Sequence, residues 1–291
     1  MAQLQARRSQ NVPGDVYVDA SCIDCDTCRW MAPAIFSRID EQSAVHQQPR
    51  SAAERQAALQ ALLACPTASI GTQEKPREIK AVQQSFPIPV TENVYHCGYH
   101  AEASFGATSY LIVQPEGNIL VDSPRFTPPL VKRLEALGGV RWLYLTHRDD
   151  VADHAKFQAH FGCDRLLHQD DITPKTETVE IPLEGTEAIA NIIPHSQIIP
   201  VPGHTRGHTV LLWQDRILFS GDHLAWSASL NHLIAFRRAC WYSWPRLKES
   251  MQQLAAYDFE WVLPGHGRRH HASREQMRQE MQVCLDWMET V

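Results

Sequence analysis

The spacing of apolar and polar residues shows a long part of the chain in which strand-like and helix-like segments alternate. Short apolar runs such as TSYLIVQ (108–114), VRWLYLTH (140–147) and HTVLLWQ (208–214) are typical of buried strands. Further runs of this kind are GNILVDSP (117–124), IIPVPGHT (198–205), RILFSGDH (216–223) and FEWVLPGHG (259–267). Helical patterns separate them at PLVKRLEALGG (129–139), RLKESMQQLAAY (246–257) and residues 272–291. This alternation predicts layered sheets covered by helices.

The first 80 residues have a different pattern. SAAERQAALQALLACP (51–66) predicts a helix that begins with a capping box formed by Ser51 and Glu54 and ends before Pro66. The polar stretch GTQEKPREIKAV (71–82) that follows is typical of a linker. We therefore expect two domains, residues 1–80 and 81–291.

Composition narrows the class of protein further. The 291 residues are 44% hydrophobic and 21% charged, and no apolar run approaches the roughly 20 residues that cross a bilayer. The N-terminus has no apolar run typical of a secretory signal, so we expect a soluble, cytoplasmic protein. The net charge of −6 gives no reason to expect nucleic acid or an anionic membrane as partner. In the cytoplasm, the eight cysteines are expected to be metal ligands or free thiols rather than disulfides.

Three of these cysteines lie within CIDCDTC (22–28). Cys22, Cys25 and Cys28 have the spacing that binds three corners of an iron–sulfur cubane, and Cys65, at the end of the expected helix, is the fourth candidate. Structural zinc is the weaker alternative, because it usually takes two separated C-x2-C pairs and the second pair is missing.

Residues 12–70 resemble a single-cluster bacterial ferredoxin in CIDCDTC, in Phe36 and in the closing CPTASI. The resemblance implies a ferredoxin-like domain with one [4Fe-4S] cluster, and a redox partner protein for that cluster. Asp24 and Asp26 flank the ligands, and two interpretations remain open for them. Their negative charge would lower the potential of the cluster, or they are solvated turn residues.

Four fragments after the apolar runs carry histidine and aspartate: THRDDVADH (146–154), PGHTRGH (202–208), SGDH (220–223) and PGHG (264–267). Each would place its polar side chains in a loop at the end of a strand, where layered α/β folds have their active sites.

In this order the fragments resemble the metallo-β-lactamase fold hydrolases, in particular the glyoxalase II-like group, over about residues 88–270. The resemblance implies an α+β chain in which a four-layer αββα sandwich follows the ferredoxin-like domain. It also implies one or two divalent metal ions. The implied first set is His147, Asp149 and His204; the second is Asp153, His154 and His266; Asp222 bridges the two, and His208 and His223 support them.

The chain departs from the family's motif H-x-H-x-D-H. Asp149 stands in place of the second histidine, and two extra residues precede Asp153. A carboxylate makes the site harder and favours iron or manganese over zinc, or it weakens the first metal position. Asp150 is a rival of Asp149 for the carboxylate role.

The leading hypothesis is a metal-dependent hydrolase of a small thioester, ester or lactone, in which Asp153 orients or deprotonates the attacking water. No G-x-S-x-G, G-x-G-x-x-G or P-loop motif competes with it. An iron-dependent oxidoreductase of oxygen, nitric oxide or persulfide, supplied with electrons by the cluster, is the second hypothesis. A non-catalytic redox-sensing scaffold is the third.

AFRRACWYSWPR (235–246) has two interpretations. Its arginines and aromatic residues could line a pocket for an anionic substrate. We favour a second reading, in which Trp241, Tyr242 and Trp244 are core residues and the arginines are exposed.

Overall fold

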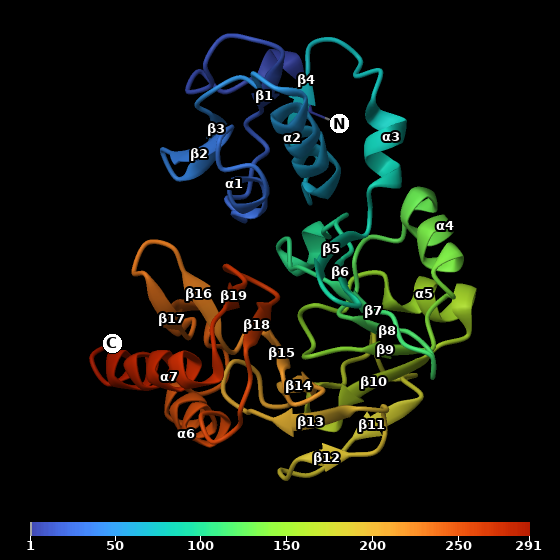
Figure 1. Cartoon of the computed structure of the whole chain (residues 1–291), viewed down its shortest axis with the longest axis vertical. Helices are drawn as coiled ribbons and strands as arrows, with labels where there is room; N and C mark the ends of the chain where they lie inside the picture. The colour runs from blue at the N-terminus through green and yellow to red at the C-terminus, as the bar shows by residue number, and fades with distance from the viewer. Residues whose placement is uncertain (1) are drawn as a thin grey trace. The chain divides into compact units, whose positions relative to one another are not determined.

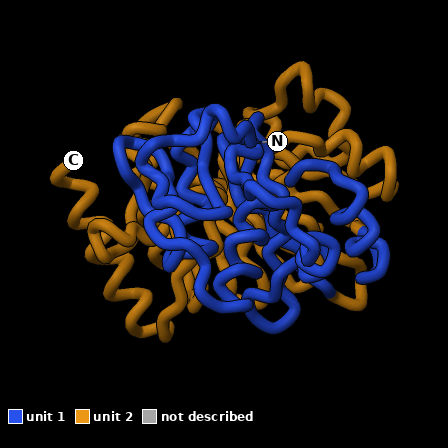
Figure 2. The backbone as a smooth tube through the Cα atoms, turned by 90° about the horizontal axis from the view of Figure 1, so that it is seen from above, with its two compact units in different colours: residues 1–113, 124–139 blue, residues 114–123, 140–291 orange. Residues whose placement is uncertain are grey.

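The computed structural model describes residues 2–291 and divides into two compact units (Figures 1 and 2). Unit 1 comprises residues 1–113 and 124–139, and unit 2 comprises residues 114–123 and 140–291. Unit 1 therefore extends beyond residue 80. That the ferredoxin-like domain itself ends at residue 80 stays a prediction.

The N-terminal part of unit 1 is built from two hairpin-like strand pairs and two helices. Its elements are η1 (Leu4–Ala6), β1 (Val16–Val18), α1 (Thr27–Met31), β2 (Phe36–Ile39), β3 (Gln42–Val45), α2 (Ala52–Ala64) and β4 (Ile70–Thr72). β1 pairs antiparallel with β4, and β2 pairs antiparallel with β3. Ile35, Phe36 and Ala61 are buried in the core that joins these elements, so the small domain has an apolar interior of its own.

Helix α2 confirms the helix expected over residues 51–66. The side-chain oxygen of Ser51 accepts a hydrogen bond from the backbone N–H of Glu54 at 3.2 Å. The carboxylate of Glu54 accepts a hydrogen bond from the backbone N–H of Arg50 at 2.6 Å instead of from that of Ser51. Of the two hydrogen bonds of the expected capping box, only the one to the Ser51 side chain therefore forms. Pro66 disfavours helical geometry at Cys65, which adopts φ −55° and ψ 121°, and the helix therefore ends at Ala64.

The remainder of unit 1 consists of α3 (Ile79–Gln84), β5 (Ile88–Thr91), β6 (Val94–His96), η2 (Glu102–Ser104), β7 (Tyr110–Ile112) and α4 (Pro128–Ala136). β6 lies between β5 and β7 and pairs antiparallel with both. The polar stretch 71–82 is not a linker throughout, because β4 includes its first two residues and α3 begins at Ile79.

Unit 2 contains parts of two sheets. The first part has the order β8 (Ile119–Val121), β9 (Trp142–Tyr144), β10 (Asp164–His168) and β11 (Ile181–Leu183), all parallel. The second sheet has the order β12 (Ile189–Ala190), β13 (Ser196–Pro200), β14 (Thr209–Trp213), β15 (Ile217–Gly221), β18 (Trp261–Pro264) and β19 (His270–His271). The other elements are α5 (His154–Phe161), η3 (Gln169–Asp171), the hairpin of β16 (Ala225–Ser227) and β17 (His232–Ile234), η4 (Arg237–Ala239), α6 (Trp244–Leu254) and α7 (Arg274–Met288).

Helices α6 and α7 cover one face of the second sheet (Figure 1). Leu247 and Met251 of α6 and Met281 of α7 belong to one buried cluster with Val210 and Leu218 of the sheet. The strands are apolar without alternation because both of their faces are buried, as the continuous runs in the sequence predict.

The fold brings the polar strand ends together. β15 and β18 are parallel, with Phe219 opposite Leu263, so Asp222 and His266, which follow these strands, lie at the same edge. The loop after β9 carries His147, and the loop after β13 carries His204.

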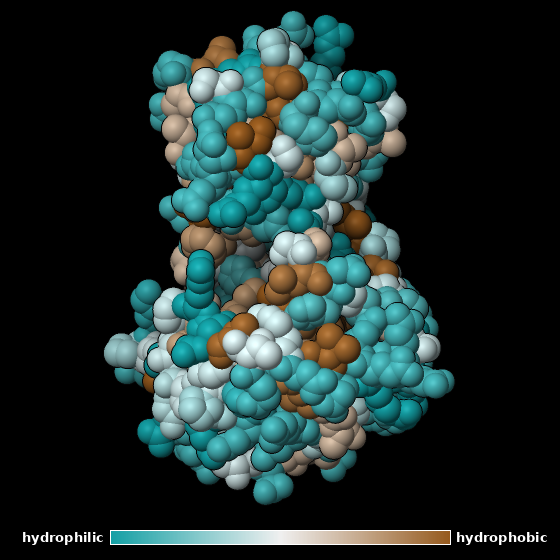
Figure 3. Space-filling view, turned by 90° about the vertical axis from the view of Figure 1, so that its left-hand side faces the viewer, coloured by the Kyte–Doolittle hydropathy of each residue, from teal (hydrophilic) through white to brown (hydrophobic). Residues whose placement is uncertain are grey.

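No helix within residues 2–291 is both long and apolar enough to cross a membrane. On the face shown in Figure 3, hydrophobic residues form small groups separated by hydrophilic ones.

Candidate metal centre

Two imidazoles and two carboxylates converge at the strand ends of unit 2. Nε2 of His204 lies 3.4 Å from Oδ2 of Asp149 and 3.7 Å from Oδ2 of Asp222. Nε2 of His147 lies 3.8 Å from the same two carboxylate oxygens. Ligands about 2.1 Å from a tetrahedral metal ion are separated by about 3.4 Å. His147, Asp149 and His204 are therefore spaced as ligands of one ion, and Asp222 adjoins them.

A second group of donors adjoins the first. His147, Asp150 and Asp222 offer atoms within 4.8 Å of one another, and Nε2 of His266 lies 3.8 Å from Oδ2 of Asp222. Oδ2 of Asp222 thus lies within 3.8 Å of the Nε2 atoms of His147, His204 and His266. The structure brings Asp149 and Asp150 to the cluster together, in different groups, so it does not make them exclusive rivals.

The buried polar atoms of this cluster have no hydrogen-bond partners among the described residues. These atoms are Nε2 of His147 and His204, Oδ2 of Asp149 and Asp150, and Oδ1 of Asp222. Buried polar groups are nearly always paired, because an unpaired one has lost its water without compensation. Convergent unpaired imidazoles and carboxylates fit divalent metal ions.

The ring of His147 is fixed by a chain of hydrogen bonds. Its Nδ1 lies 2.9 Å from Oγ1 of Thr146, which donates in turn to the carboxylate of Asp122 at 3.0 Å. The backbone N–H of Thr146 also donates to Asp122, at 2.8 Å. Such support fixes the tautomer and leaves the lone pair on Nε2, which faces the cluster. Burial lowers the pKa of His147 to about 4, so its ring is neutral as a ligand requires.

Asp171 braces two of the loops that carry the cluster. Its carboxylate is fully buried and accepts hydrogen bonds from Oγ1 of Thr205 at 2.5 Å and from the backbone N–H of Gly207 at 2.8 Å. It also accepts from the backbone N–H of Arg148 at 3.1 Å. The sequence analysis missed this residue, because nothing near it in the chain belongs to the cluster. The only signal was an aspartate pair, Asp170 and Asp171, directly after an apolar strand.

Two glycines allow the backbone to approach the cluster. A Cβ atom at Gly265 would lie 2.8 Å from Oδ2 of Asp150 and 3.0 Å from Oδ1 of Asp222. Gly221 has φ +50°, and its Cβ would lie 2.6 Å from Oγ1 of Thr146. Gly265 is therefore required by close contact with candidate ligand side chains, and Gly221 by close contact with Thr146, which supports His147.

Asp153 and His154 lie outside both donor groups. They lie at the start of α5, where Asp153 is the N-cap residue and His154 is the first residue of the helix. Asp153 forms an ion pair with Lys156 at 2.7 Å, and Nδ1 of His154 lies 3.1 Å from the guanidinium of Arg165. Asp150, rather than Asp153, lies in the donor group with His147 and Asp222.

His208 and His223 are fully buried beside the cluster. Nε2 of His208 accepts a hydrogen bond from the backbone N–H of Asp222 at 3.1 Å, so His208 holds a ligand loop rather than facing an ion. Neither ring nitrogen of His223 has a partner among the described residues, and burial lowers its pKa to about 3.

The four thiols expected as cluster ligands lie around one cavity in unit 1. Cys22, Cys25, Cys28 and Cys65 all line it. The backbone N–H of Ser43 donates to Sγ of Cys22 at 3.4 Å, and the N–H of Ser69 donates to Sγ of Cys65 at 3.2 Å. Burial raises the pKa of the Cys25 thiol to about 11, so its thiolate needs positive charge beside it. N–H donors to sulfur and buried, convergent thiols fit an iron–sulfur cluster. All eight cysteines of the chain are free of disulfides.

The aspartates that flank these thiols are paired with arginines. Arg29 lies 2.6 Å from Asp24 and 2.6 Å from Asp26, and Arg38 lies 2.7 Å from Asp24. The two aspartates are thus neither free charges nor merely solvated turn residues. The guanidinium groups offset their effect on the potential of a bound cluster.

Two of the aromatic residues expected in the core are exposed. The exposed fractions are 61% for Trp241 and 49% for Tyr242, while Trp244 is half-buried against the core of α6. The backbone N–H groups of Trp241 and Tyr242 both donate to the carbonyl oxygen of His204. The ring of Trp241 lies 6.3 Å from the ring of His204 in a T-shaped arrangement, so this exposed side chain lies beside a candidate ligand.

Comparisons with known proteins match both the region of the four thiols and the region of the candidate metal centre. Residues 18–72 match the family described as the 4Fe-4S single cluster domain of Ferredoxin I. The structure of FIM-1 from Pseudomonas aeruginosa, a metallo-β-lactamase in its mono-zinc form, has a TM-score of 0.53 at 19% identity, over 69% of this chain and 93% of that one. A metallo-β-lactamase from Hirschia baltica has a TM-score of 0.53 at 15% identity, over 68% and 96%. About two thirds of the chain thus has a metallo-β-lactamase fold.

A curated relative is more similar in sequence over a shorter stretch. The hydroxyacylglutathione hydrolase of Anaeromyxobacter dehalogenans (strain 2CP-C) is 32% identical over 127 residues, which are 42% of this chain. The chain spans about half of that protein, 48% of its length. Both expected resemblances are confirmed: the chain combines a single-cluster ferredoxin domain with a metallo-β-lactamase fold similar to that of glyoxalase II-like proteins.

Proposed function

We propose that the chain is a metal-dependent hydrolase of a small thioester, ester or lactone with an attached [4Fe-4S] domain. The observation that carries the proposal is the cluster of unpartnered buried donors at the strand ends. The similarity to a hydroxyacylglutathione hydrolase supports a thioester as the first substrate to test.

The residues divide into two sets in this proposal. His147, Asp149 and His204 hold one divalent ion; Asp150 and His266 hold a second; and Asp222 bridges them. Bound ions of this kind lower the pKa of water and polarise a carbonyl oxygen. Asp150, in place of Asp153, orients the attacking water and accepts its proton, because its Oδ2 atom is otherwise unpartnered in the cluster. Without a cation, burial and then the neighbouring Asp222 raise the pKa of Asp150 well above its usual range, so the ionised carboxylate needs positive charge beside it.

One observation favours a second candidate, an iron-dependent oxidoreductase. Asp149, Asp150 and Asp222 give the cluster three carboxylates beside its histidines, and oxygen-rich sites favour iron over zinc. A cluster in unit 1 would then supply electrons through a redox partner protein or directly. Iron beyond the four atoms of a [4Fe-4S] cluster, together with oxygen consumption, would support this candidate.

The test is hydrolysis by the full chain loaded with zinc, manganese or iron, with glutathione thioesters, simple esters and lactones as substrates. The proposal predicts turnover of at least one class, and a loss of kcat/KM of at least about 100-fold in H204A. The exposed His195, which lies 3.4 Å from Glu116, offers the matched control H195A, which should retain activity. No turnover of any class by metal-loaded protein would overturn the proposal.

A further inference from the structure

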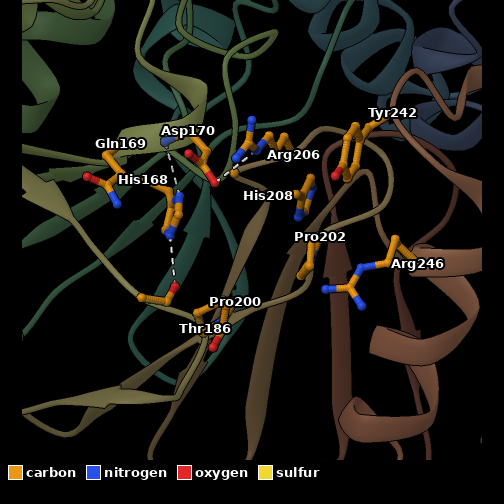
Figure 4. A pocket seen from close by; sticks show the side chains of 12 residues that line it. His168, Gln169, Asp170, Thr186, Pro200, Pro202, Arg206, His208, Tyr242 and Arg246 are labelled. Atoms are coloured by element: carbon orange, nitrogen blue, oxygen red, sulfur yellow. Dashed lines mark hydrogen bonds and ion pairs between the residues drawn. The ribbon is translucent and has the colours of Figure 1, made fainter.

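Two groups of polar side chains lie outside the proposed metal centre. One group lines a cavity in unit 2, where Nε of Arg206 is paired with the carboxylate of Asp170 at 3.3 Å (Figure 4). Arg246 in the same lining is paired with Glu249 at 2.6 Å, so the charge of each arginine is balanced. The other group is buried in unit 1, where hydrogen bonds connect two histidines with a candidate cluster ligand.

The two histidines are His96, the last residue of β6, and His100, in the loop that follows this strand. Both are buried, with exposed fractions of 1% and 0%. Their Nε2 atoms are 2.8 Å apart, so an N–H of one ring donates to the other. The ring of Trp30 in α1 packs beside them, at centroid distances of 5.1 Å and 6.2 Å. Both histidines lie outside residues 18–72, which match the ferredoxin family.

The second ring nitrogen of His100 carries a hydrogen. Nδ1 lies 2.7 Å from the carbonyl oxygen of Gly106, which can only accept, so Nδ1–H is the donor in this contact. This assignment holds for the neutral and for the protonated ring. The same Nδ1 lies 3.2 Å from Oγ1 of Thr27, and an N–H can only donate to that oxygen. The hydroxyl hydrogen of Thr27 therefore does not point at His100 and is directed to another acceptor.

That acceptor is the sulfur of Cys25, whose Sγ lies 3.4 Å from Oγ1 of Thr27. A cysteine that binds a cluster is a thiolate and has no hydrogen to donate, so the Thr27 hydroxyl is the donor. Burial raises the pKa of the Cys25 thiol, and the hydroxyl and backbone N–H of Thr27 act in the opposite direction, as donors to a thiolate do. Gly106 allows this close approach, because a Cβ atom there would lie 2.9 Å from Cβ of Cys25.

We propose that His100, whose ring is fixed by His96, keeps the hydroxyl of Thr27 directed at the Cys25 ligand and thereby raises the reduction potential of a bound [4Fe-4S] cluster. When an external donor adds one electron, part of the new negative charge falls on the ligand sulfurs, and an O–H donor stabilises it. His100 and His96 are positioning residues, because they act through Thr27. Residues that follow the ferredoxin-like domain thus adjust the potential of its cluster, whatever reaction the metal centre performs.

The test is a redox titration of the anaerobically purified full chain with dithionite, followed by visible absorption and electron paramagnetic resonance. T27V removes the hydroxyl and keeps the shape of the side chain. At the midpoint potential of the unaltered chain, its ratio of reduced to oxidised cluster should be at least about threefold lower, which is a shift of about 28 mV for one electron. T27S keeps a hydroxyl and should titrate as the unaltered chain does.

H100L tests the positioning role, because leucine cannot donate to Oγ1 of Thr27 and leaves its hydroxyl free to turn. The ratio should fall in H100L, and the double variant T27V/H100L should be no lower than T27V, because the two residues act through one hydrogen bond. A merely structural effect of H100L would add to that of T27V. His46 is an exposed histidine of unit 1, 3.1 Å from the carbonyl oxygen of Pro33, and its variant H46Q should titrate as the unaltered chain does.

Several results would overturn the proposal. One is equal midpoint potentials in T27V and the unaltered chain, and another is a shift in T27S as large as that in T27V. Additive shifts in T27V/H100L would show that His100 does not act through Thr27. A full chain that binds no cluster would also overturn it. If H100L does not retain its full iron content, the comparison of T27V with T27S decides the outcome.

Discussion

Oδ2 of Asp149 lies 3.4 Å from Nε2 of His204, in the group that also contains His147. In the candidate ligand group, a carboxylate thus stands at the sequence position where the resembled family has a histidine. The contact with His204 lowers the pKa of Asp149, so the carboxylate is ionised and able to bind a cation.

The first prediction concerns the metal that this position selects. Replacing Asp149 by histidine should shift binding toward zinc, because an imidazole is a softer donor than a carboxylate. The measurement is the metal content of D149H and of the unaltered chain after dialysis against equal concentrations of zinc and iron(II), corrected for the iron of the cluster. D149A should lose one bound ion.

Asp153 provides the control for this experiment, because it pairs with Lys156 outside the donor groups. D153A should keep the metal content of the unaltered chain. An equal loss in D153A and D149A would contradict the proposed ligand set and return Asp153 to it.

The second prediction concerns Asp171. Removing its carboxylate in D171A leaves two buried donors and one part-buried donor without their acceptor, so the free energy of unfolding should fall by about 2–4 kcal/mol. Metal affinity should also fall by about 10- to 100-fold, because Asp171 braces the loops of His147 and His204. Urea denaturation and competition with a chelator measure the two effects.

The neighbouring Asp170 tests whether this effect is specific. Its carboxylate pairs with the exposed Arg206, so D170A should change the free energy of unfolding by less than about 0.5 kcal/mol. A D171A variant as stable as D170A, with unchanged metal affinity, would show that the loops do not depend on Asp171.

The third prediction concerns pH. Burial raises the pKa of Asp122 from 3.8 to about 8, with a smaller contribution from Asp222, in the protein without metal ions. Its native state therefore holds a proton that the unfolded chain releases, so this group's contribution to stability is fully present below about pH 4 and is lost as pH rises toward 8. The expected slope for one such group is a fall of about 1.4 kcal/mol in the free energy of unfolding per pH unit.

Chelator-treated protein, denatured with urea at several pH values, measures this slope. In D122N, the free energy of unfolding should change less with pH between pH 4 and 8. In the unaltered chain, zinc should reduce the slope, because a cation stabilises the neighbouring carboxylates. The assignment fails if D122N and the unaltered chain lose stability with pH at the same rate.

The fourth prediction concerns the four thiols. C25S should lower the iron content attributable to a [4Fe-4S] cluster and reduce its visible absorption, because Cys25 lines the cavity with the other three cysteines. The buried Cys163 lies in unit 2 and serves as control, so C163S should keep the full cluster. Loss of iron in both variants alike would argue against the assigned ligands.

The strands and helices could be predicted from the sequence where their apolar pattern is continuous, as in the runs that become β14, β15 and α6. The four thiols could be predicted because their ligand spacing is local. His147, His204, Asp222 and His266 could be predicted because each follows a strand, and strand ends meet at one edge.

Other features depend on contacts that local patterns do not encode. The motif predicted Asp153 and His154 in the cluster, but α5 begins at His154 and carries that ring toward Arg165. Asp171 became recognisable only when the fold placed it against Arg148 and Gly207. Trp241 is exposed and its ring lies beside His204, which its apolar character does not predict.

Elemental analysis of anaerobically purified full chain, combined with electron paramagnetic resonance, tests the central claim most directly. The account predicts four iron atoms in a cluster and, in addition, at least one divalent metal ion that is lost in H204A while the cluster signal stays unchanged. Protein that contains the cluster iron alone, and binds no further metal when zinc, manganese or iron is supplied, would contradict the account.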